Sequence, residues 1–284
     1  MATNSHLRSS AAAASLLAAA LVAAHARPAA ATQVRSTCGG TRTALAHLRL
    51  SASLPTRTIA LPILMYHRID VLRPTLPAMT HRLTVAPADF AAQMAWLKRA
   101  GFHPVTERQA FEALEHGARL PSKPIMISFD DGYRDVLEYA SPVLARLGMP
   151  ATAYVITGRI SGSDPSFLTW KNLRVLEQRG IEIGSHTVTH ADLTQLPDAQ
   201  AMSELCDSRA ALERRLGHPV QWFAYPYGRE DARVAELAHR AGYVLAVTTR
   251  SGSTQSAASP LELHRYEVLD TTGASGLASL LGAR

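Results

Sequence analysis

Short apolar segments alternate with helical segments from about residue 60 to the end of the chain. The apolar segments lack the polar alternation of a half-exposed strand, so both faces of each strand should be buried, which is typical of a parallel sheet covered by helices. About seven such units favour an α/β fold, and a closed or nearly closed (β/α) barrel over an open sheet. The predicted strands are 61–67, 123–129, 151–157, 181–186, 220–226, 243–249 and 261–268.

The segments between these strands have helical spacing and helix stop signals. In the first of them, Phe90, Met94 and Leu97 recur at helical intervals before Gly101. Glycine just after the last periodic residue is a common helix terminator. The predicted helices are 89–101, 136–148, 169–180, 199–217, 231–242 and 275–283.

Polar side chains follow several of the predicted strands at their carboxyl ends. In (β/α) barrels these ends meet on one face, which carries the active site. Polar groups that are costly to bury would therefore gather at one rim of the barrel. The residues at these positions are His67, Asp130, Asp131, Ser185, His186, His190, Tyr225 and Tyr227.

Two of these groups together indicate a metal site. His186 and His190 are spaced so that both imidazoles can reach one ion. Two histidines and one carboxylate leave positions open for water and substrate, which is a catalytic arrangement. The adjacent pair Asp130 and Asp131 then has an explanation, because one carboxylate can bind the cation while the other acts as a base on water.

Three motifs in this order, SFDDG (128–132), SHTVTH (185–190) and YPYG (225–228), resemble the polysaccharide deacetylases of carbohydrate esterase family 4. The segments LPILMYHRI (61–69) and FAAQMAWLKRAGF (90–102) are similar to the branch that de-N-acetylates exopolysaccharides. The resemblance covers roughly residues 60–270. It implies a deformed (β/α) barrel, one divalent metal ion that is usually Zn²⁺, and an N-acetylated polysaccharide as substrate.

The resemblance also assigns roles to individual positions. Asp130 matches the catalytic base, and Asp131, His186 and His190 match the metal ligands. The backbone N–H of Tyr227 matches an oxyanion-hole donor.

The chain departs from the family pattern at two places. Ala224 stands where the family has an arginine that orients the base, and Arg265 in the last predicted strand is a candidate substitute. The family also has a histidine acid near its C-terminus, for which this chain offers His264. We favour His67, at the rim end of the first strand, as the general acid, because histidine can donate a proton near pH 7.

The expected activity is hydrolysis of N-acetyl groups by a water that the metal activates, with Asp130 as base. Trp170, Trp222, Tyr225 and Tyr227 could stack on sugars, although the two tryptophans could equally be packing residues. Two alternatives remain open at this point. One is an esterase that removes O-acetyl groups, and the other is a non-catalytic sugar-binding domain of the same fold.

The positive charge of the chain belongs to its N-terminal segment. The formal net charge is +6, and residues 1–60 hold six arginines and no acidic residue, which leaves 23 basic and 23 acidic groups in residues 61–284. A nucleic-acid-binding fold should itself carry a basic face, so we expect no nucleic-acid partner.

The N-terminal segment itself indicates export. The apolar run 11–24 has the length of a signal-peptide core and is too short to span a bilayer, so we expect no transmembrane helix in the mature chain. A transit peptide and a start codon assigned too early are the alternatives. We predict a signal peptide or leader at 1–31, a linker at 32–58, and a catalytic domain at 59–284 in a periplasmic or extracellular protein.

Cys38 and Cys206 are too few to form a disulfide framework and say little about the compartment.

Overall fold

The computed structural model describes Cys38, residues 57–160 and residues 162–282. Its central feature is a curled sheet in which seven parallel strands follow the order β10-β9-β8-β7-β6-β2-β12. These strands are β2 (Ile63–Tyr66), β6 (Pro124–Phe129), β7 (Ala151–Val155), β8 (Ile181–Ser185), β9 (Trp222–Ala224), β10 (Leu245–Val247) and β12 (Tyr266–Glu267). The predicted deformed barrel of about seven parallel strands is confirmed.

The two ends of the sheet meet beside β12. Leu263, just before that strand, forms a parallel bridge with Val247 of β10, while Tyr266 pairs with Leu64 of β2. One chain segment thus touches both sheet ends and nearly closes the barrel. The shorter strand β5 (His103–Pro104) adds to the beginning of β6, and two further pairs lie outside the barrel: β1 (Thr58–Ala60) with β11 (Thr254–Ser256), and β3 (Arg68–Ile69) with β4 (Thr84–Val85).

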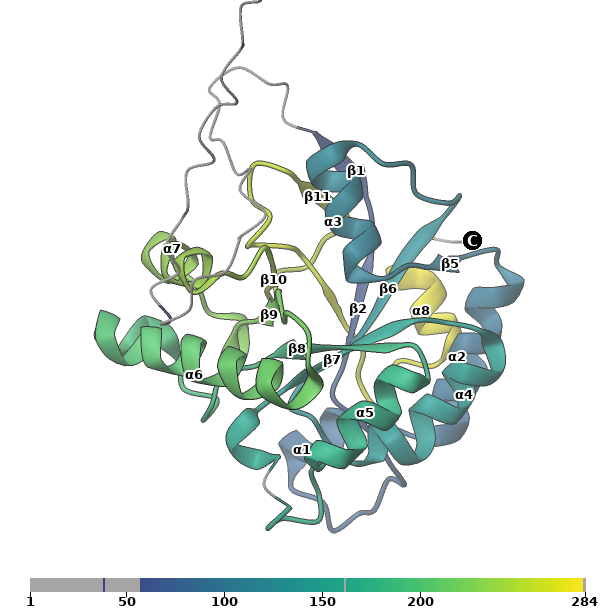
Figure 1. Ribbon diagram of the computed structural model, residues 1–284. Helices are drawn as coiled ribbons and strands as arrows, with labels where there is room; N and C mark the ends of the chain where they lie inside the picture. The colour runs from purple at the N-terminus through teal and green to yellow at the C-terminus, as the bar shows by residue number, and fades with distance from the viewer. Residues whose placement is uncertain (1–37, 39–56, 161, 283–284) are drawn as a thin grey trace, which may run out of the picture.

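Helices surround the sheet, as Figure 1 shows, with α6 and α7 on one side and α2, α4 and α8 on the other. They are α1 (Ala78–Arg82), α2 (Pro87–Arg99), α3 (Glu107–His116), α4 (Ser141–Leu147), α5 (Trp170–Gln178), α6 (Asp198–Leu216), α7 (Ala232–Ala241) and α8 (Ala274–Leu280). A π-helical turn, Val136–Ala140, leads into α4, and Gly148, Gly217 and Gly242 end α4, α6 and α7 in left-handed conformations.

Helix α3 is an element that the hydrophobic pattern did not single out. The sequence nevertheless carries its signals, because Thr106 and Gln109 form a reciprocal capping box and Gly117 ends the helix in a left-handed conformation. Its first residue, Glu107, is fully buried under the barrel and donates its backbone N–H to Glu182 at 2.7 Å.

The apolar core lies mainly between the strands and the helices. Leu64, Ile127 and Phe129, for example, pack against Phe90 and Met94 of α2. Inside the barrel, by contrast, polar side chains are buried together, and Arg265, Ser128 and Thr152 are each at most 1 % exposed. Buried polar groups need partners, and their partners define the candidate site described below.

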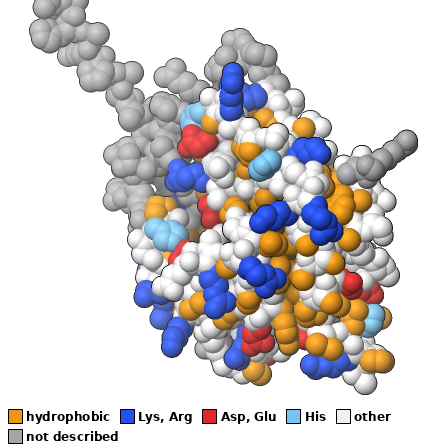
Figure 2. Space-filling model, turned by 90° about the vertical axis from the view of Figure 1, so that its right-hand side faces the viewer, with side chains coloured by type: hydrophobic (Ala, Val, Ile, Leu, Met, Phe, Trp, Pro, Cys, Tyr) orange, Lys and Arg blue, Asp and Glu red, His pale blue; other side chains and the backbone are white. Residues whose placement is uncertain are grey.

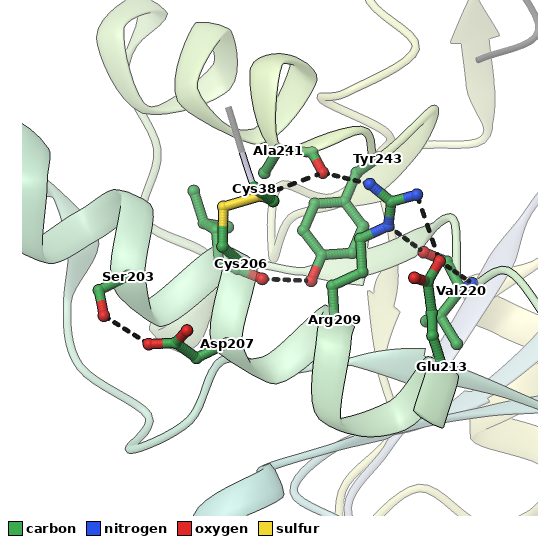
Figure 3. Close-up of a disulfide and its surroundings, with 10 residues drawn as sticks. Cys38, Ser203, Cys206, Asp207, Arg209, Glu213, Val220, Ala241 and Tyr243 are labelled. Carbon is green, nitrogen blue, oxygen red and sulfur yellow. Dashed lines mark hydrogen bonds and ion pairs between the residues drawn. A yellow bond between two sulfur atoms is a disulfide. The ribbon is translucent and has the colours of Figure 1, made fainter. Parts of the chain in front are cut away.

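A disulfide joins Cys38 to Cys206 on α6, with 5.4 Å between the Cα atoms (Figure 3). Around it, Tyr243 donates its hydroxyl to the carbonyl of Leu205, and Arg209 donates to the carbonyls of Val220 and Ala241. No local sequence pattern pairs the two cysteines, because they lie 168 residues apart. Both cysteines pack against one apolar cluster, to which α6 and α7 contribute residues.

Most of the predicted N-terminal organisation lies outside the described residues. That holds for the whole expected leader, 1–31, and for the expected linker apart from Cys38, Arg57 and Thr58. Among the residues that the structure describes, no helix is long and apolar enough to cross a membrane. Lys and Arg side chains are spread over the face in Figure 2 and are not gathered into one band. The expected absence of a nucleic-acid partner stays a prediction.

Candidate active site

The predicted rim residues come together because the strands that precede them are neighbours in the parallel sheet. Asp130 and Asp131 follow β6, His186 follows β8, and His67 follows β2. The backbone continues the strand pairing into this region: Asp130 donates its N–H to Tyr66, and His186 donates to Val155, at 2.9 and 3.0 Å.

Asp131, His186 and His190 form one compact cluster of ligand-type atoms. A carboxylate oxygen and two ring nitrogens lie within 4.8 Å of one another. The Nε2 atom of each histidine is 3.5 Å from Oδ1 of Asp131, which is longer than a direct hydrogen bond but suits a shared ion between them. The donor set of two imidazoles and one carboxylate fits a divalent metal such as Zn²⁺ with positions left for water and substrate.

The orientation of His186 supports the same interpretation. Its Nδ1 lies 2.8 Å from the carbonyl oxygen of Ala224, so the ring donates its proton there and turns a lone pair on Nε2 toward Asp131. Histidines that bind metals usually have such a second hydrogen bond, which fixes the tautomer.

The backbone at the cluster adopts left-handed conformations at residues other than glycine. Asp131 has φ 71°, Thr187 has φ 67° and His190 has φ 66°. Such conformations cost free energy for residues with a Cβ atom and concentrate at functional sites. The glycine after the aspartates is also required, because Gly132 has φ 79° and a Cβ there would lie 3.0 Å from the side chain of Val155.

Asp130 has a different partner from Asp131, namely Arg265. The guanidinium donates to both carboxylate oxygens, at 2.8 and 2.7 Å, and both side chains are almost completely buried. Arg265 also donates to Ser128 Oγ and to the carbonyl of Thr248. Arg265, the candidate substitute for the arginine that the family pattern has at the position of Ala224, thus contacts Asp130 directly.

These contacts give the two aspartates opposite electrostatic properties. Burial alone would raise the pKa of Asp130, but the charge and hydrogen bonds of Arg265 outweigh it and hold the pKa of Asp130 well below its usual range. Burial, together with the charge of Asp130, raises the pKa of Asp131 to about 7, although the hydroxyl of Tyr133 donates a hydrogen bond to it. The sequence analysis did not single out Tyr133, which lies two residues after Asp131.

The structure separates the two histidines that were considered for the general acid. His67 is at the rim, where the charges of Asp130, Arg265 and His190 act on it, and burial lowers its pKa to about 4. Its Nδ1 is buried without a hydrogen-bond partner among the described residues. His264 precedes β12, whose Tyr266 pairs with Leu64, so it lies level with the start of β2, whereas His67 follows the end of that strand.

His264 has surroundings of its own at that end. Its backbone N–H donates to the buried side chain of Gln255, and its side chain lines a cavity of about 250 Å³ with Arg250 and Glu262. Apart from His264 itself, none of the residues predicted for the active site lines this cavity.

Of the four aromatic residues that could stack on sugars, Tyr227 alone is well exposed at the site. Its side chain is 58 % exposed, and its ring centroid lies 4.5 Å from that of His190. The other three pack elsewhere: Trp222 is in the core against Phe111, Tyr225 is fully buried, and Trp170 is half-buried under the guanidinium of Arg215. The burial of Tyr225 contradicts the interpretation of its ring as a sugar-stacking face, and Trp222 is a packing residue, the alternative that was left open for it.

The turn that carries Tyr227 is sterically determined. Tyr227 has φ 60°, and at Gly228 a Cβ would lie 2.2 Å from Thr249 Oγ1, so glycine is required. The backbone of Tyr227 is thereby fixed next to the ring of a predicted metal ligand.

Comparison with known proteins agrees with this geometry. Residues 117–246 match the polysaccharide deacetylase family model. The polysaccharide deacetylase YxkH of Bacillus subtilis is 34% identical over 218 residues, which span 77% of this chain and 74% of that protein. The poly-beta-1,6-N-acetyl-D-glucosamine N-deacetylase of Escherichia coli K12 is 31% identical over 119 residues, 37% of this chain but only 18% of that protein.

The deacetylase PplD of Streptococcus pyogenes, solved in complex with acetate, superposes on this fold with a TM-score of 0.73 and 32% identity. The superposition covers 79% of this chain and 99% of PplD. Given the extended similarity to YxkH, the matching family model and the shared fold, the chain belongs to the polysaccharide deacetylase family.

Proposed function

We propose that this protein is a metal-dependent hydrolase that removes N-acetyl groups from an N-acetylglucosamine-type polysaccharide. The observation that carries the proposal is that the two neighbouring aspartates have different partners. Asp131 lies with His186 and His190 in a cluster suited to a metal ion, while Asp130 is held apart from it by Arg265. A protein that only bound sugars would not need an ionised carboxylate in this position.

The roles in the reaction follow from these positions. A divalent ion held by Asp131, His186 and His190 would polarise the acetamide carbonyl and lower the pKa of a water molecule. Asp130, kept ionised and fixed in orientation by Arg265, accepts the proton of the attacking water. The N–H of Tyr227 donates to the oxyanion of the tetrahedral intermediate.

The leaving amine needs a proton, for which we propose His67. Because the pKa of His67 is lowered to about 4, this side chain is neutral near pH 7 in the substrate-free protein. The negative charge that develops on the oxyanion favours the protonated form of a nearby imidazole. His67 therefore takes up one proton from solvent as the oxyanion forms and passes that proton to the leaving nitrogen as the C–N bond breaks, while Asp130 later returns the proton of the attacking water to solvent.

The names of relatives and the exposed aromatic ring support the substrate class. The E. coli relative is named for poly-beta-1,6-N-acetyl-D-glucosamine, and Tyr227 offers an exposed ring beside the cluster, as sugar-binding sites require. O-acetyl ester hydrolysis is the second candidate, because PplD was solved with acetate, the product common to both reactions.

We further propose that the protein is exported, with a leader at 1–31, a linker at 32–58 and the catalytic domain at 59–284. The Cys38–Cys206 disulfide supports export, since disulfides persist mainly in oxidising compartments. It also means that one residue of the proposed linker stays covalently attached to α6.

The decisive experiment combines metal analysis with mass spectrometry of products. Zn²⁺-loaded protein should release acetate from β-1,6-linked N-acetylglucosamine oligomers. Each sugar that reacts should lose the mass of one acetyl group, about 42 Da. Asp130→Asn should keep the metal but lose about 10²- to 10⁴-fold in turnover. His186→Ala and His190→Ala should lose the metal itself.

An O-acetylated polymer serves as the competing substrate. Turnover of the ester alone would move the assignment to the esterase. Inactivity on both polymers, with stoichiometric metal present, would contradict the proposal, and so would full metal occupancy in both histidine variants.

A further inference from the structure

We propose that Glu204 on α6 is a positioning residue that sets the geometry of the loop carrying His186 and His190; this inference rests on the proposed metal-dependent function. Glu204 is not adjacent in sequence to any predicted site residue, and the sequence motifs did not include it. It acts on the loop through backbone and hydroxyl contacts and touches no reacting atom.

The contacts of Glu204 cover the middle of the loop between the two histidines. Its Oε2 accepts hydrogen bonds from the backbone N–H groups of Val188 and Thr189, at 2.8 and 2.9 Å. Its Oε1 accepts a third bond from the Thr189 hydroxyl at 2.8 Å. Hydrogen bonds to a carboxylate are stronger than those between neutral groups.

The opposite side of the same loop is held through its carbonyl groups. Thr157 and Gly158 donate their N–H groups to the carbonyls of Thr187 and Val188, at 3.1 and 2.9 Å. This approach is so close that a Cβ on Gly158 would lie 2.5 Å from the Val188 oxygen. The loop is therefore held between the 3₁₀ turn Thr157–Arg159, which follows β7, and the side chain of Glu204.

A clamp is needed because the loop has strained backbone at both of its ends. Thr187 and His190 have positive φ angles, which return toward ordinary values unless the surroundings prevent it. Rotation at either residue would turn an imidazole away from Asp131. The three bonds from Glu204 oppose that rotation.

Helix α6 is a rigid support for this purpose. One turn beyond Glu204, the buried hydroxyl of Ser208 bonds that of Ser185, next to His186, at 2.8 Å. Between the two lies Cys206, which the disulfide ties to Cys38. The helix thus contacts the chain around His186 and His190 at two points, and the disulfide joins it to Cys38.

The test is the affinity of the metal-free protein for Zn²⁺, measured by competition with a chromophoric chelator at constant pH. Glu204→Ala should weaken binding by about 10- to 100-fold, the range typical when a group supporting metal ligands is removed. Glu204→Gln retains an oxygen that can accept from the two N–H groups and should recover part of the loss. Glu204→Asp keeps the charge but shortens its reach, so it should bind more weakly than the wild type.

Glu213→Ala is the matched control on the same helix. Glu213 also accepts from a loop N–H, that of Val220 at 3.1 Å, and pairs with Arg209, but that loop leads into the start of β9 and away from the cluster. Its removal should lower thermal stability yet leave the Zn²⁺ affinity within about twofold of wild type, the scatter expected for a distant site. The Co²⁺-loaded proteins give a second readout, because the visible spectrum reports ligand geometry.

Each outcome has a defined meaning. Wild-type affinity and an unchanged Co²⁺ spectrum in folded Glu204→Ala would overturn this inference while leaving the proposed function intact. Weak Zn²⁺ binding by the wild type itself would overturn the proposed function and the inference with it. If the alanine variant fails to fold, the Gln and Asp variants decide the question by the same comparison.

Discussion

At the residue scale, the main result is that two adjacent carboxylates have separate surroundings. Asp130 is bound on both oxygens by Arg265, whereas Asp131 faces two neutral imidazoles and the hydroxyl of Tyr133. A neighbouring cation keeps the first ionised, while burial and the charge of its neighbour disfavour ionisation of the second. A bound metal ion would supply the positive charge that Asp131 otherwise lacks.

Substitution of single histidines tests which residue is the general acid. His67→Ala should reduce kcat by about 10²-fold or more, as expected for a lost acid, while metal content stays unchanged. His264→Ala should have little effect, because His264 lies level with the start of β2, away from His67 at its end, and lines a separate cavity. Steady-state kinetics of both variants on the same oligosaccharide make the comparison.

The reverse ranking would assign the acid to the last strand segment. In that case the strand register near β12 would have to differ from the pairing of Tyr266 with Leu64.

At the element scale, helix α3 begins with a buried carboxyl group that forms no ion pair with the described cationic side chains. Glu107 is fully buried, accepts a hydrogen bond from the Tyr154 hydroxyl, and lies close to Glu182. Burial, followed by the charge of Glu182, raises the pKa of Glu107 well above its ordinary value. The folded protein therefore holds Glu107 protonated at pH values where the unfolded chain has lost that proton.

This predicts that Glu107 lowers the free energy of unfolding as the pH rises. The contribution of Glu107 to stability is fully present below its unfolded pKa of about 4.5 and is lost as the pH rises toward the folded pKa, at up to about 1.4 kcal/mol per pH unit for one proton. Glu107→Gln, which cannot ionise, should therefore gain stability relative to wild type between pH 5 and pH 8. Urea unfolding at the two pH values measures the difference.

Glu112→Gln on the exposed face of α3 is the control, because Glu112 pairs only with surface groups, Arg108 and His116. Its stability difference from wild type should not grow with pH in this way. An equal pH trend in both variants would show that Glu107 is ionised in the folded protein.

At the scale of the whole molecule, the disulfide connects the N-terminal part of the chain to the barrel. Cys38 and Cys206 are 168 residues apart, so the bond closes a long loop that includes β2, β6, β7 and β8. Cross-linking such a loop restricts the unfolded chain much more than the folded one. The strands that carry most of the predicted site residues therefore lie within the covalently closed part.

The double variant Cys38→Ser/Cys206→Ser should be less stable than the oxidised wild type by about 2–4 kcal/mol. The physical reason is the larger conformational entropy of the open unfolded chain. Denaturant unfolding with and without a reducing agent measures this, and the reductant should affect the wild type only. A wild-type transition that does not move on reduction would contradict the prediction.

The sequence by itself determined the class of fold, the strands along the chain and the grouping of the polar residues at the strand ends. These follow from local patterns: apolar strands, helix stop signals, and the polar residues directly after the strands, including Asp130, Asp131 and His186. Strand ends in a parallel barrel must share one rim, so residues far apart in sequence could be grouped before any geometry was known.

Tertiary structure alone decided which partners those residues have. The pairing of Arg265 with Asp130, the hydrogen bonds of Glu204 to the loop between His186 and His190, and the bond between Cys38 and Cys206 all join segments that are distant in sequence. Local propensity carries no information on such contacts. They depend on how the barrel closes and how the helices pack on it, because only then do particular side chains come within hydrogen-bonding or bonding distance.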